Sequence, residues 1–186
     1  MALTTAQRVT LKAAILADTN PLVIAALGGG DVGRNDTELA RLYNLDSTFV
    51  VWRKDASKSA IFGAITWKNM TPADAPDGTV LQTNRNLACQ GKQFVLQTML
   101  ISPGETLDMS IQKIRDGIKD SVQNLPAGLN GAGVDAGWAG IKVVSTRFVT
   151  VAEKLFATGT GTDATPGTPV FEGMVTIDDI GGAMNG

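Results

Sequence analysis

Apolar residues recur at intervals of three and four over much of the chain, which is the spacing of one helical face. In the first 45 residues the apolar runs are short, and each follows a residue that commonly caps a helix. The expected helices cover residues 5–18, 21–28 and 37–44, and their candidate caps are Thr4, Asn20 and Asn35. Residues 1–45 are therefore predicted to form three short helices.

Residues 47–55 interrupt this helical pattern. The segment, "STFVVWRKD", is rich in β-branched and aromatic residues, so it is predicted to be extended, as a strand or a packed connector. Helical spacing returns in residues 57–70. The run "TPADAPDG" at residues 71–78 then brings two prolines and a glycine, and it is the clearest predicted internal boundary in the first half.

The longest periodic segments lie between residues 80 and 158. Apolar residues seven apart predict one long helix with a single apolar stripe, formed by Val80, Leu87, Phe94 and Ile101. Two further helices are predicted over residues 111–125 and 135–158, and a glycine-rich turn between them favours an antiparallel hairpin. The last of these helices is predicted from the spacing of Trp138, Ile141, Val144, Phe148, Val151 and Leu155.

The C-terminal segment has a different composition. Residues 159–167, "GTGTDATPG", lack a helical or strand pattern and are predicted to be a flexible tether. Residues 169–177, "PVFEGMVTI", are rich in β-branched residues and are predicted to form a strand or hairpin arm. One face of that strand would carry Phe171, Val175 and Ile177, and this is the face expected to be covered.

These elements predict a mainly α fold, a helical bundle with a long antiparallel helix hairpin and a small C-terminal β-strand or hairpin arm. The helical domain would span residues 1–158 and the glycine-tethered β arm residues 159–186. Within the helical domain we expect short helices at 1–45, an extended segment plus a helix at 46–76, and long helices at 77–158.

Composition excludes several classes of function. A chain of 186 residues can bury a core of its own, and a formal net charge of −2 with scattered lysines and arginines argues against specific nucleic-acid binding. No apolar run approaches the ~18 residues of a membrane span, and the first residues lack the order of a signal peptide. We therefore expect neither a membrane partner nor a nucleic-acid ligand.

Candidate chemistry is sparse. Histidine is absent, which removes the commonest general base and metal ligand, and the single cysteine, Cys89, is expected to be a small buried residue. The glycine run at 28–33 lacks the strand and helix of a phosphate-binding loop, so it is expected to end a helix. Asp178 and Asp179 are adjacent and are expected at a strand end or in the cap of a final helical turn. No catalytic residue, cofactor or metal site is predicted, and the tryptophans are expected in the core: Trp52, Trp67 and Trp138.

Three blocks of the sequence resemble a known family. "FVVWRKDAS", "RDGIKDSV" and "AEKLFATGTGTDATPGTPVFEGMVTIDDI" are similar to small proteins encoded among the morphogenesis genes of tailed bacteriophages and prophages. The sequence departs from the family pattern before Glu153 and in a long inserted region at about residues 77–105. The matching positions are Val51–Arg53, Arg115–Ile118, Glu153–Leu155, Ala157–Gly161 and Phe171–Gly173.

The resemblance implies a structural virion protein and no enzymatic activity. The expected role is a head-to-tail connector, an adaptor or neck ring of identical copies between the portal protein and the tail or neck proteins, through which DNA can pass. Such a protein would be synthesised in the bacterial host cytoplasm and located in the virion. The alternatives are a tail-terminator, collar or capsid-decorating protein and, in a different class, a small-ligand-binding or enzymatic module that uses the 159–167 loop.

A connector of this kind needs exposed segments that reach its neighbours. Strand addition is an economical way for an extended arm to dock, because backbone hydrogen bonds give strength and alternate side chains give register. The partner interface is therefore expected in the extended segment and in the C-terminal arm. Its candidate residues are Trp52, Arg53, Phe171, Glu172, Val175 and Ile177.

Overall fold

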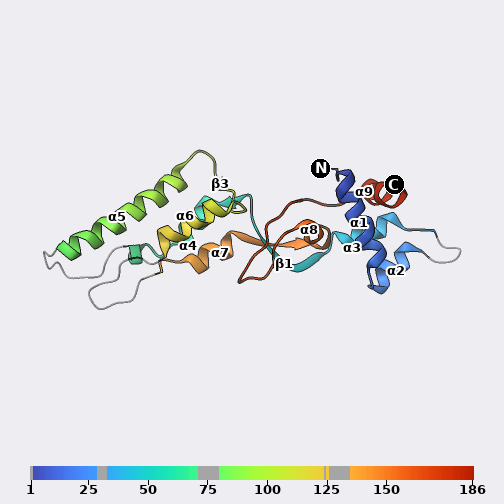
Figure 1. The fold of residues 1–186 in the computed structure, drawn as a ribbon, viewed down its shortest axis with the longest axis horizontal. Coiled ribbons are helices and arrows are strands. Elements are labelled where there is room, and N and C mark those ends of the chain that lie inside the picture. The colour runs from blue at the N-terminus through green and yellow to red at the C-terminus, as the bar shows by residue number, and fades with distance from the viewer. Residues whose placement is uncertain (1, 29–32, 71–79, 124, 126–134) are drawn as a thin grey trace. The chain divides into compact units, whose positions relative to one another are not determined.

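The computed structural model describes residues 2–28, 33–70, 80–123, 125 and 135–186, with the side chains of 80–82 left out (Figure 1). The chain is mainly helical and divides into two compact units. Unit 1 combines Met1–Val51 with Phe148–Gly186, and unit 2 is Trp52–Arg147. This division differs from the predicted one at residue 158. The predicted boundary at 71–78 and most of the predicted turn after residue 125 lie outside the described residues.

The first three helices of unit 1 confirm the prediction. They are α1 (Thr5–Ala17), α2 (Pro21–Leu27) and α3 (Asp36–Tyr43). The side chains of the predicted caps Thr4, Asn20 and Asn35 each accept a hydrogen bond from a backbone N–H of the first turn. Because capping is a local interaction, the sequence alone was sufficient to place these starts.

The C-terminal segment is part of the unit 1 core rather than a free arm. Residues 169–176 carry no regular strand, and the chain ends in a helix, α9 (Ile177–Asn185). This helix packs against α1 and α3, and a further short helix, α8 (Val151–Phe156), contacts α1. Phe171 and Val175 are buried in the same cluster as Leu11 and Ile15. The predicted glycine-tethered β arm is therefore wrong, because its apolar side chains find cover within their own chain.

A strand interrupts the helix predicted over residues 135–158. The chain there forms α7 (Trp138–Val144), then β4 (Thr146–Thr150), then α8. Strand β4 pairs with β1 (Asp46–Trp52), which lies in the segment that was predicted to be extended. The β4 sequence "TRFVT" is β-branched and aromatic, so pairing with β1 outweighs a helical spacing of apolar residues that is coincidental.

Unit 2 contains two packed helix pairs. Helix α5 (Val80–Ile101) lies along α6 (Gln112–Val122), and α4 (Lys58–Ala64) packs against α7. A short 3-10 helix at Trp67–Met70 follows α4, so the helix predicted over 57–70 is real only in its first half. The small sheet of β2 (Ala56–Ser57) and β3 (Thr106–Leu107) is antiparallel.

The predicted hairpin between residues 111–125 and 135–158 does not form as expected. Its second helix is reduced to the seven residues of α7, which packs against α4, whereas α6 packs against α5. Gly137 makes the α4–α7 contact possible, because its φ is +116° and a Cβ there would lie 2.5 Å from the carbonyl oxygen of Ala64. Helix α7 begins at Trp138 with Gly137 as its N-cap rather than at Asp135, although the Asp135 carboxylate accepts from the Trp138 N–H at 2.8 Å.

Candidate functional site

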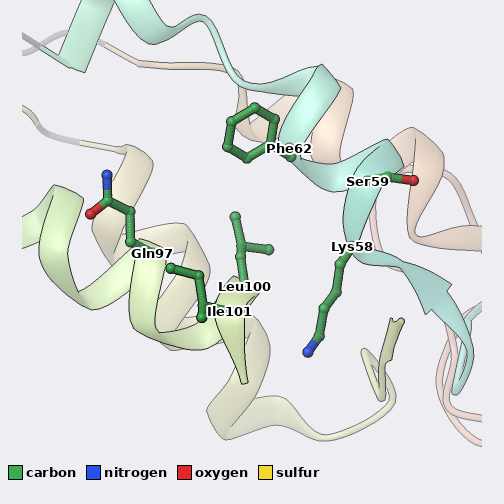
Figure 2. A pocket seen from close by; sticks show the side chains of 6 residues that line it. All are labelled: Lys58, Ser59, Phe62, Gln97, Leu100 and Ile101. Atoms are coloured by element: carbon green, nitrogen blue, oxygen red, sulfur yellow. The ribbon is translucent and has the colours of Figure 1, made fainter. Parts of the chain in front are cut away.

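A groove in unit 2 lies between α4 and α5. Its volume is about 540 Å³, and its lining comes from Lys58, Ser59 and Phe62 of α4 and from Gln97, Leu100 and Ile101 of α5 (Figure 2). The side chains of Phe62 and Leu100 extend toward one another from the two helices. The ring of Phe62 also packs on Trp67, with centroids 4.5 Å apart, yet about half of Phe62 remains exposed. The walls of the groove are therefore mostly apolar.

Lys58 fixes the end of the groove by capping α5. Its ammonium donates to the carbonyl oxygen of Ser102, to the Ser102 hydroxyl at 2.9 Å and to the carbonyl oxygen of Pro103 at 3.5 Å. A cation at this position also interacts favourably with the C-terminal end of the helix dipole. Because three donors of the buried ammonium are engaged, Lys58 acts as a link between α4 and the C-terminal end of α5.

The solvent face of α5 continues the apolar surface beyond the groove. A second hollow of about 370 Å³ is lined by Phe94, Gln97, Thr98, Ile101 and Ser102. Leu87, Phe94 and Ile101 are 60%, 71% and 80% exposed, so the described members of the predicted seven-residue stripe face solvent. The stripe was predicted from its spacing, but the spacing gave no information about which side of α5 the chain covers.

The opposite side of α5 faces the unit 2 core. Cys89 and Leu96 are buried there, in one cluster with Ile118 and Val122 of α6. Burial raises the pKa of the Cys89 thiol, and Lys92 offsets this only in part, which disfavours the nucleophilic thiolate. The predicted burial of Cys89 is confirmed. Among the described residues, no group of three or more carboxylate or thiol side chains could hold a metal ion.

The loop predicted to be a flexible tether is a folded part of unit 1. The carbonyl oxygen of Gly161 accepts from the Val50 N–H at 2.8 Å, and the Gly167 N–H donates to the carbonyl oxygen of Val50 at 2.8 Å. Thr158 and Thr168 exchange two backbone hydrogen bonds, at 3.0 and 2.9 Å. The loop is thus closed at its base and bound to β1, so the prediction of a tether is wrong.

Glycine is required in this loop for a reason that composition does not reveal. Gly161 has a φ of +65°, and a Cβ at that position would lie 2.2 Å from the ring of Phe49. The ring therefore occupies the space that any side chain would need. A glycine run that is typical of a linker here serves close packing against β1 instead.

A hollow of about 570 Å³ adjoins the loop within unit 1. It is lined by Thr48, Phe49, Val50, Phe148, Lys154 and the loop residues Thr160, Gly161, Thr162 and Asp163. Lys154 and Asp163 bring opposite charges to this lining. Hydroxyl groups predominate among its other polar side chains, so the hollow is more polar than the groove between α4 and α5.

The two predicted interface residues in the extended segment lie at the start of unit 2. Trp52 is buried, its ring centroid is 6.1 Å from that of Trp138, and the Arg115 guanidinium lies 4.9 Å from its centre. Arg53 pairs with Asp55 at 3.0 Å, and this hydrogen bond lowers the pKa of Asp55. The predicted core position of Trp52 is confirmed, and its side chain is covered within unit 2.

The four predicted interface residues of the C-terminal segment are not equivalent. Phe171 and Val175 are buried, and the Phe171 ring packs edge-on against Phe156 at 5.5 Å. Glu172 is half-buried, whereas Ile177 is about half exposed. Two of the four therefore contribute to the core of unit 1, and Ile177 is the apolar member that reaches solvent.

Two residues that were not predicted as site residues hold this segment in place. The side-chain amide of Asn44 donates to the Val175 carbonyl oxygen at 2.8 Å and accepts from the Val175 N–H at 2.9 Å. The carboxylate of buried Glu153 accepts from the N–H groups of Gly173 at 2.9 Å and Thr150 at 3.2 Å. The capping-box spacing of Thr150 and Glu153 was a signal that could have revealed the start of α8.

Asp179 ties the two termini of the chain together. Its carboxylate accepts from the Leu3 N–H at 3.1 Å and forms a capping box with Thr176, which confirms the predicted cap of a final helical segment. Burial by itself raises the pKa of Asp179, but the hydrogen bonds from Leu3 and Thr176, with nearby Arg8, hold that pKa below its ordinary value. The ionised form of Asp179 therefore stabilises unit 1.

Among the described helices none alone is long and apolar enough to cross a membrane, and α1 and α2 meet such a requirement only as a pair that is bent by 111°. No protein-family model, curated protein or solved structure matches the chain.

Proposed function

We propose that the chain is a structural protein of a tailed-bacteriophage virion, a head-to-tail connector that forms a ring of identical copies between the portal protein and the tail or neck. The observation that carries this proposal is the solvent face of α5. Leu87, Phe94 and Ile101 are exposed there beside the apolar groove that α5 forms with α4. The largest exposed apolar patch of a protein is often functional.

The chemistry of the groove supports contact with protein rather than a reaction. Its lining combines Phe62, Leu100 and Ile101 with the neutral side chains of Ser59 and Gln97. The one charged group in the lining, Lys58, donates to the backbone at the end of α5. An assembly protein requires apolar surfaces of this kind, because hydrophobic burial is the main favourable term in most protein association.

The resemblance of three sequence blocks to phage morphogenesis proteins gives the proposal its biological setting. In this setting the helix hairpin of the connector is the pair α5 and α6, which pack along each other in unit 2. The chain would be synthesised in the bacterial host cytoplasm and would reach the virion by assembling with its portal and tail partners.

Particle composition tests this proposal. Particles purified from the phage or prophage that encodes the chain are digested, and the chain is quantified by mass spectrometry against the major capsid protein. A connector ring predicts on the order of six to twelve copies per particle. Hundreds of copies would indicate the alternative of a capsid-decorating protein, and absence of the chain from particles would contradict a virion role.

The location of the chain in an image of the intact particle separates the remaining structural alternatives. A connector lies between portal and tail, a collar protein surrounds that junction, and a tail-terminator lies on the last tail ring. The Phe94→Glu variant is expected to enter fewer particles than the wild type. Val143→Glu, which changes an exposed residue of α7 in the same unit, is the matched control and is expected to enter normally.

A second candidate function rests on the hollow beside the 159–167 loop. Lys154, Thr160 and Asp163 converge on it, and they could interact with a small polar ligand. Calorimetry with nucleotides and divalent cations tests this alternative. Saturable binding that is lost in Lys154→Ala would support a ligand-binding module, and its absence would leave the structural proposal as the sole candidate.

A further inference from the structure

Over its described residues, the outer face of α5 carries no charged side chain. From residue 83 to residue 101 the described residues that are exposed are all neutral: Thr83, Asn84, Asn86, Leu87, Ala88, Gln90, Gly91, Phe94, Val95, Gln97, Thr98 and Ile101. The two cations of this stretch lie on the other side, since Arg85 is buried and Lys92 pairs with Asp120 of α6 at 3.2 Å. A solvated helical face ordinarily carries charges. This face therefore has the composition of a surface that is covered.

The exposed apolar area is sufficient for a stable pair. Leu87, Phe94, Val95 and Ile101 of α5, with Phe62 of α4 beside them, are each about half or more exposed. At ~100 Å² apiece they present on the order of 500 Å² of apolar surface. A standard-size interface buries about 800 Å² per partner, of which about 57% is apolar. The apolar area that such an interface requires is thus already present on one copy.

The pattern on this face is self-complementary. The exposed stripe is spaced by seven residues and is symmetric about Phe94, with Leu87 on one side and Ile101 on the other. Two copies that lie antiparallel would place the two Phe94 rings at the two-fold axis and would place Leu87 of one copy near Ile101 of the other. Because the face is neutral, pairing like with like brings no repulsion between equal charges.

Gly91 adds an independent indication of close approach. It lies in the middle of α5, three residues before Phe94, where glycine is unfavourable for a helix. Among the described residues, a Cβ at Gly91 would meet nothing within 4 Å, so packing against them does not require the glycine. The open space is on the exposed face, where it can admit a ring from a facing helix.

We propose that the outer face of α5 pairs with the same face of a second copy of this chain, across a two-fold axis close to Phe94. The inference rests on the proposed function only in treating this face as an assembly surface. A two-fold pair is a contact between two copies in solution and not the lateral contact of a ring, whose neighbours meet through two different surfaces. The pairing is measured on the purified chain, so the chain can prove monomeric in solution and still be found in particles. Conversely, the chain can be absent from particles and still form the pair in solution.

Sedimentation velocity over a concentration series of about 1 to 100 μM tests the pairing. The wild type is expected to pass from monomer to dimer within this range. Phe94→Glu brings two carboxylates together at the axis and is expected to weaken the dimer at least ~100-fold. Val143→Glu, at a residue of α7 that is 72% exposed, is the matched control and is expected to dimerise like the wild type.

A second variant separates loss of pairing from loss of folding. Gly91→Gln places a Cβ where no described atom of its own chain lies within 4 Å, on the exposed face, and glutamine favours a helix, so its circular dichroism and melting temperature are expected to equal or exceed those of the wild type. The same side chain fills the space between facing helices and is expected to weaken the dimer ~10-fold. A wild type that stays monomeric throughout the series, or a dimer that both Phe94→Glu and Gly91→Gln leave intact, would overturn the inference.

Discussion

Helices α5 and α6 pack along each other in unit 2, but their solvent faces differ in character. The exposed residues of α6 are largely charged, and they include Lys113, Asp116 and Lys119. Its apolar residues Ile118 and Val122 are buried, so the apolar face of α6 is covered by other residues of the same chain. Helix α5 carries apolar residues on both sides, and only one of these sides is covered. The two helices show that a helix can bury apolar residues in the core and still leave other apolar residues exposed to solvent.

The inner side of α5 explains why both of its faces can be apolar. Cys89 and Leu96 are also seven residues apart, and both are buried against the α6 side of the core. The two cations of the helix are on this inner half, where the Lys92 ammonium donates to the Asp120 carbonyl oxygen and pairs with its carboxylate. A charged side chain of the kind that normally lies on a solvent face thus links α5 to α6, and the outer face of α5 is left neutral.

The largest expected difference is between two leucines of α5. Leu96→Ala removes a fully buried side chain and is expected to lower the free energy of unfolding by about 3 kcal/mol. Leu87→Ala, at an exposed position of the same helix, is expected to change it by less than about 0.5 kcal/mol. Urea denaturation at a concentration where the chain is monomeric measures both values. Equal losses in the two variants would show that the outer stripe is covered within the monomer.

The end of α5 offers a test of intermediate size. Lys58→Ala removes the ammonium that donates to Ser102 and Pro103, and it is expected to lower the free energy of unfolding by about 1–2 kcal/mol. The matched control is Lys113→Ala on the solvent face of α6, with an expected change under about 0.5 kcal/mol. If both lysines prove equally dispensable, Lys58 does not anchor the end of α5.

Replacing one glycine of each helix by alanine is expected to affect stability differently in α5 and in α6. Gly91→Ala on α5 meets open space and is expected to stabilise the monomer by up to about 1 kcal/mol, the difference in helix propensity. Gly117→Ala on α6 places its Cβ 3.3 Å from the Met99 methyl carbon, so crowding is expected to cancel that gain. Thermal unfolding at low protein concentration measures the two changes. A gain at Gly117 equal to that at Gly91 would contradict the close packing of α5 on α6.

The smallest expected effect is that of salt. Because the outer face of α5 is neutral, the dimer dissociation constant is expected to change less than about two-fold between about 0.05 and 0.5 M salt. An interface that used the charged face of α6 would respond more strongly. Sedimentation at the two salt concentrations distinguishes these surfaces, and a large salt dependence would direct attention to α6.

The features of the fold that depend on interactions between residues close in sequence could be predicted. Thr4, Asn20 and Asn35 cap helices through atoms a few residues away, so their sequence context was sufficient. The strand β4 could not be predicted in the same way, since Phe148 and Val151 continue a helical spacing by coincidence. Its partner β1 lies about a hundred residues earlier in the chain, and without knowledge of that partner the β-branched and aromatic residues of β4 did not outweigh the helical spacing.

The candidate site was predicted only in part for a related reason. The seven-residue stripe was visible in the sequence, but its exposure depends on which face of α5 meets α6. Phe171 and Val175 were correctly expected to be covered, although the cover comes from helices of their own unit rather than from a neighbour. Ile177, expected on the same covered face, is about half exposed. The 159–167 loop has the composition of a linker, and the Phe49 ring that occupies the space beside Gly161 could not be inferred from that composition.

Cross-linking through one introduced cysteine tests most directly whether the outer face of α5 is an assembly surface. Phe94→Cys places a thiol at the expected axis, while the native Cys89 is buried and its raised pKa disfavours the thiolate. Under mild oxidation Phe94→Cys is expected to form a disulfide-linked dimer, and Val143→Cys, equally exposed on α7, is expected to stay monomeric. A Phe94→Cys protein that cross-links no faster than Val143→Cys would contradict the account.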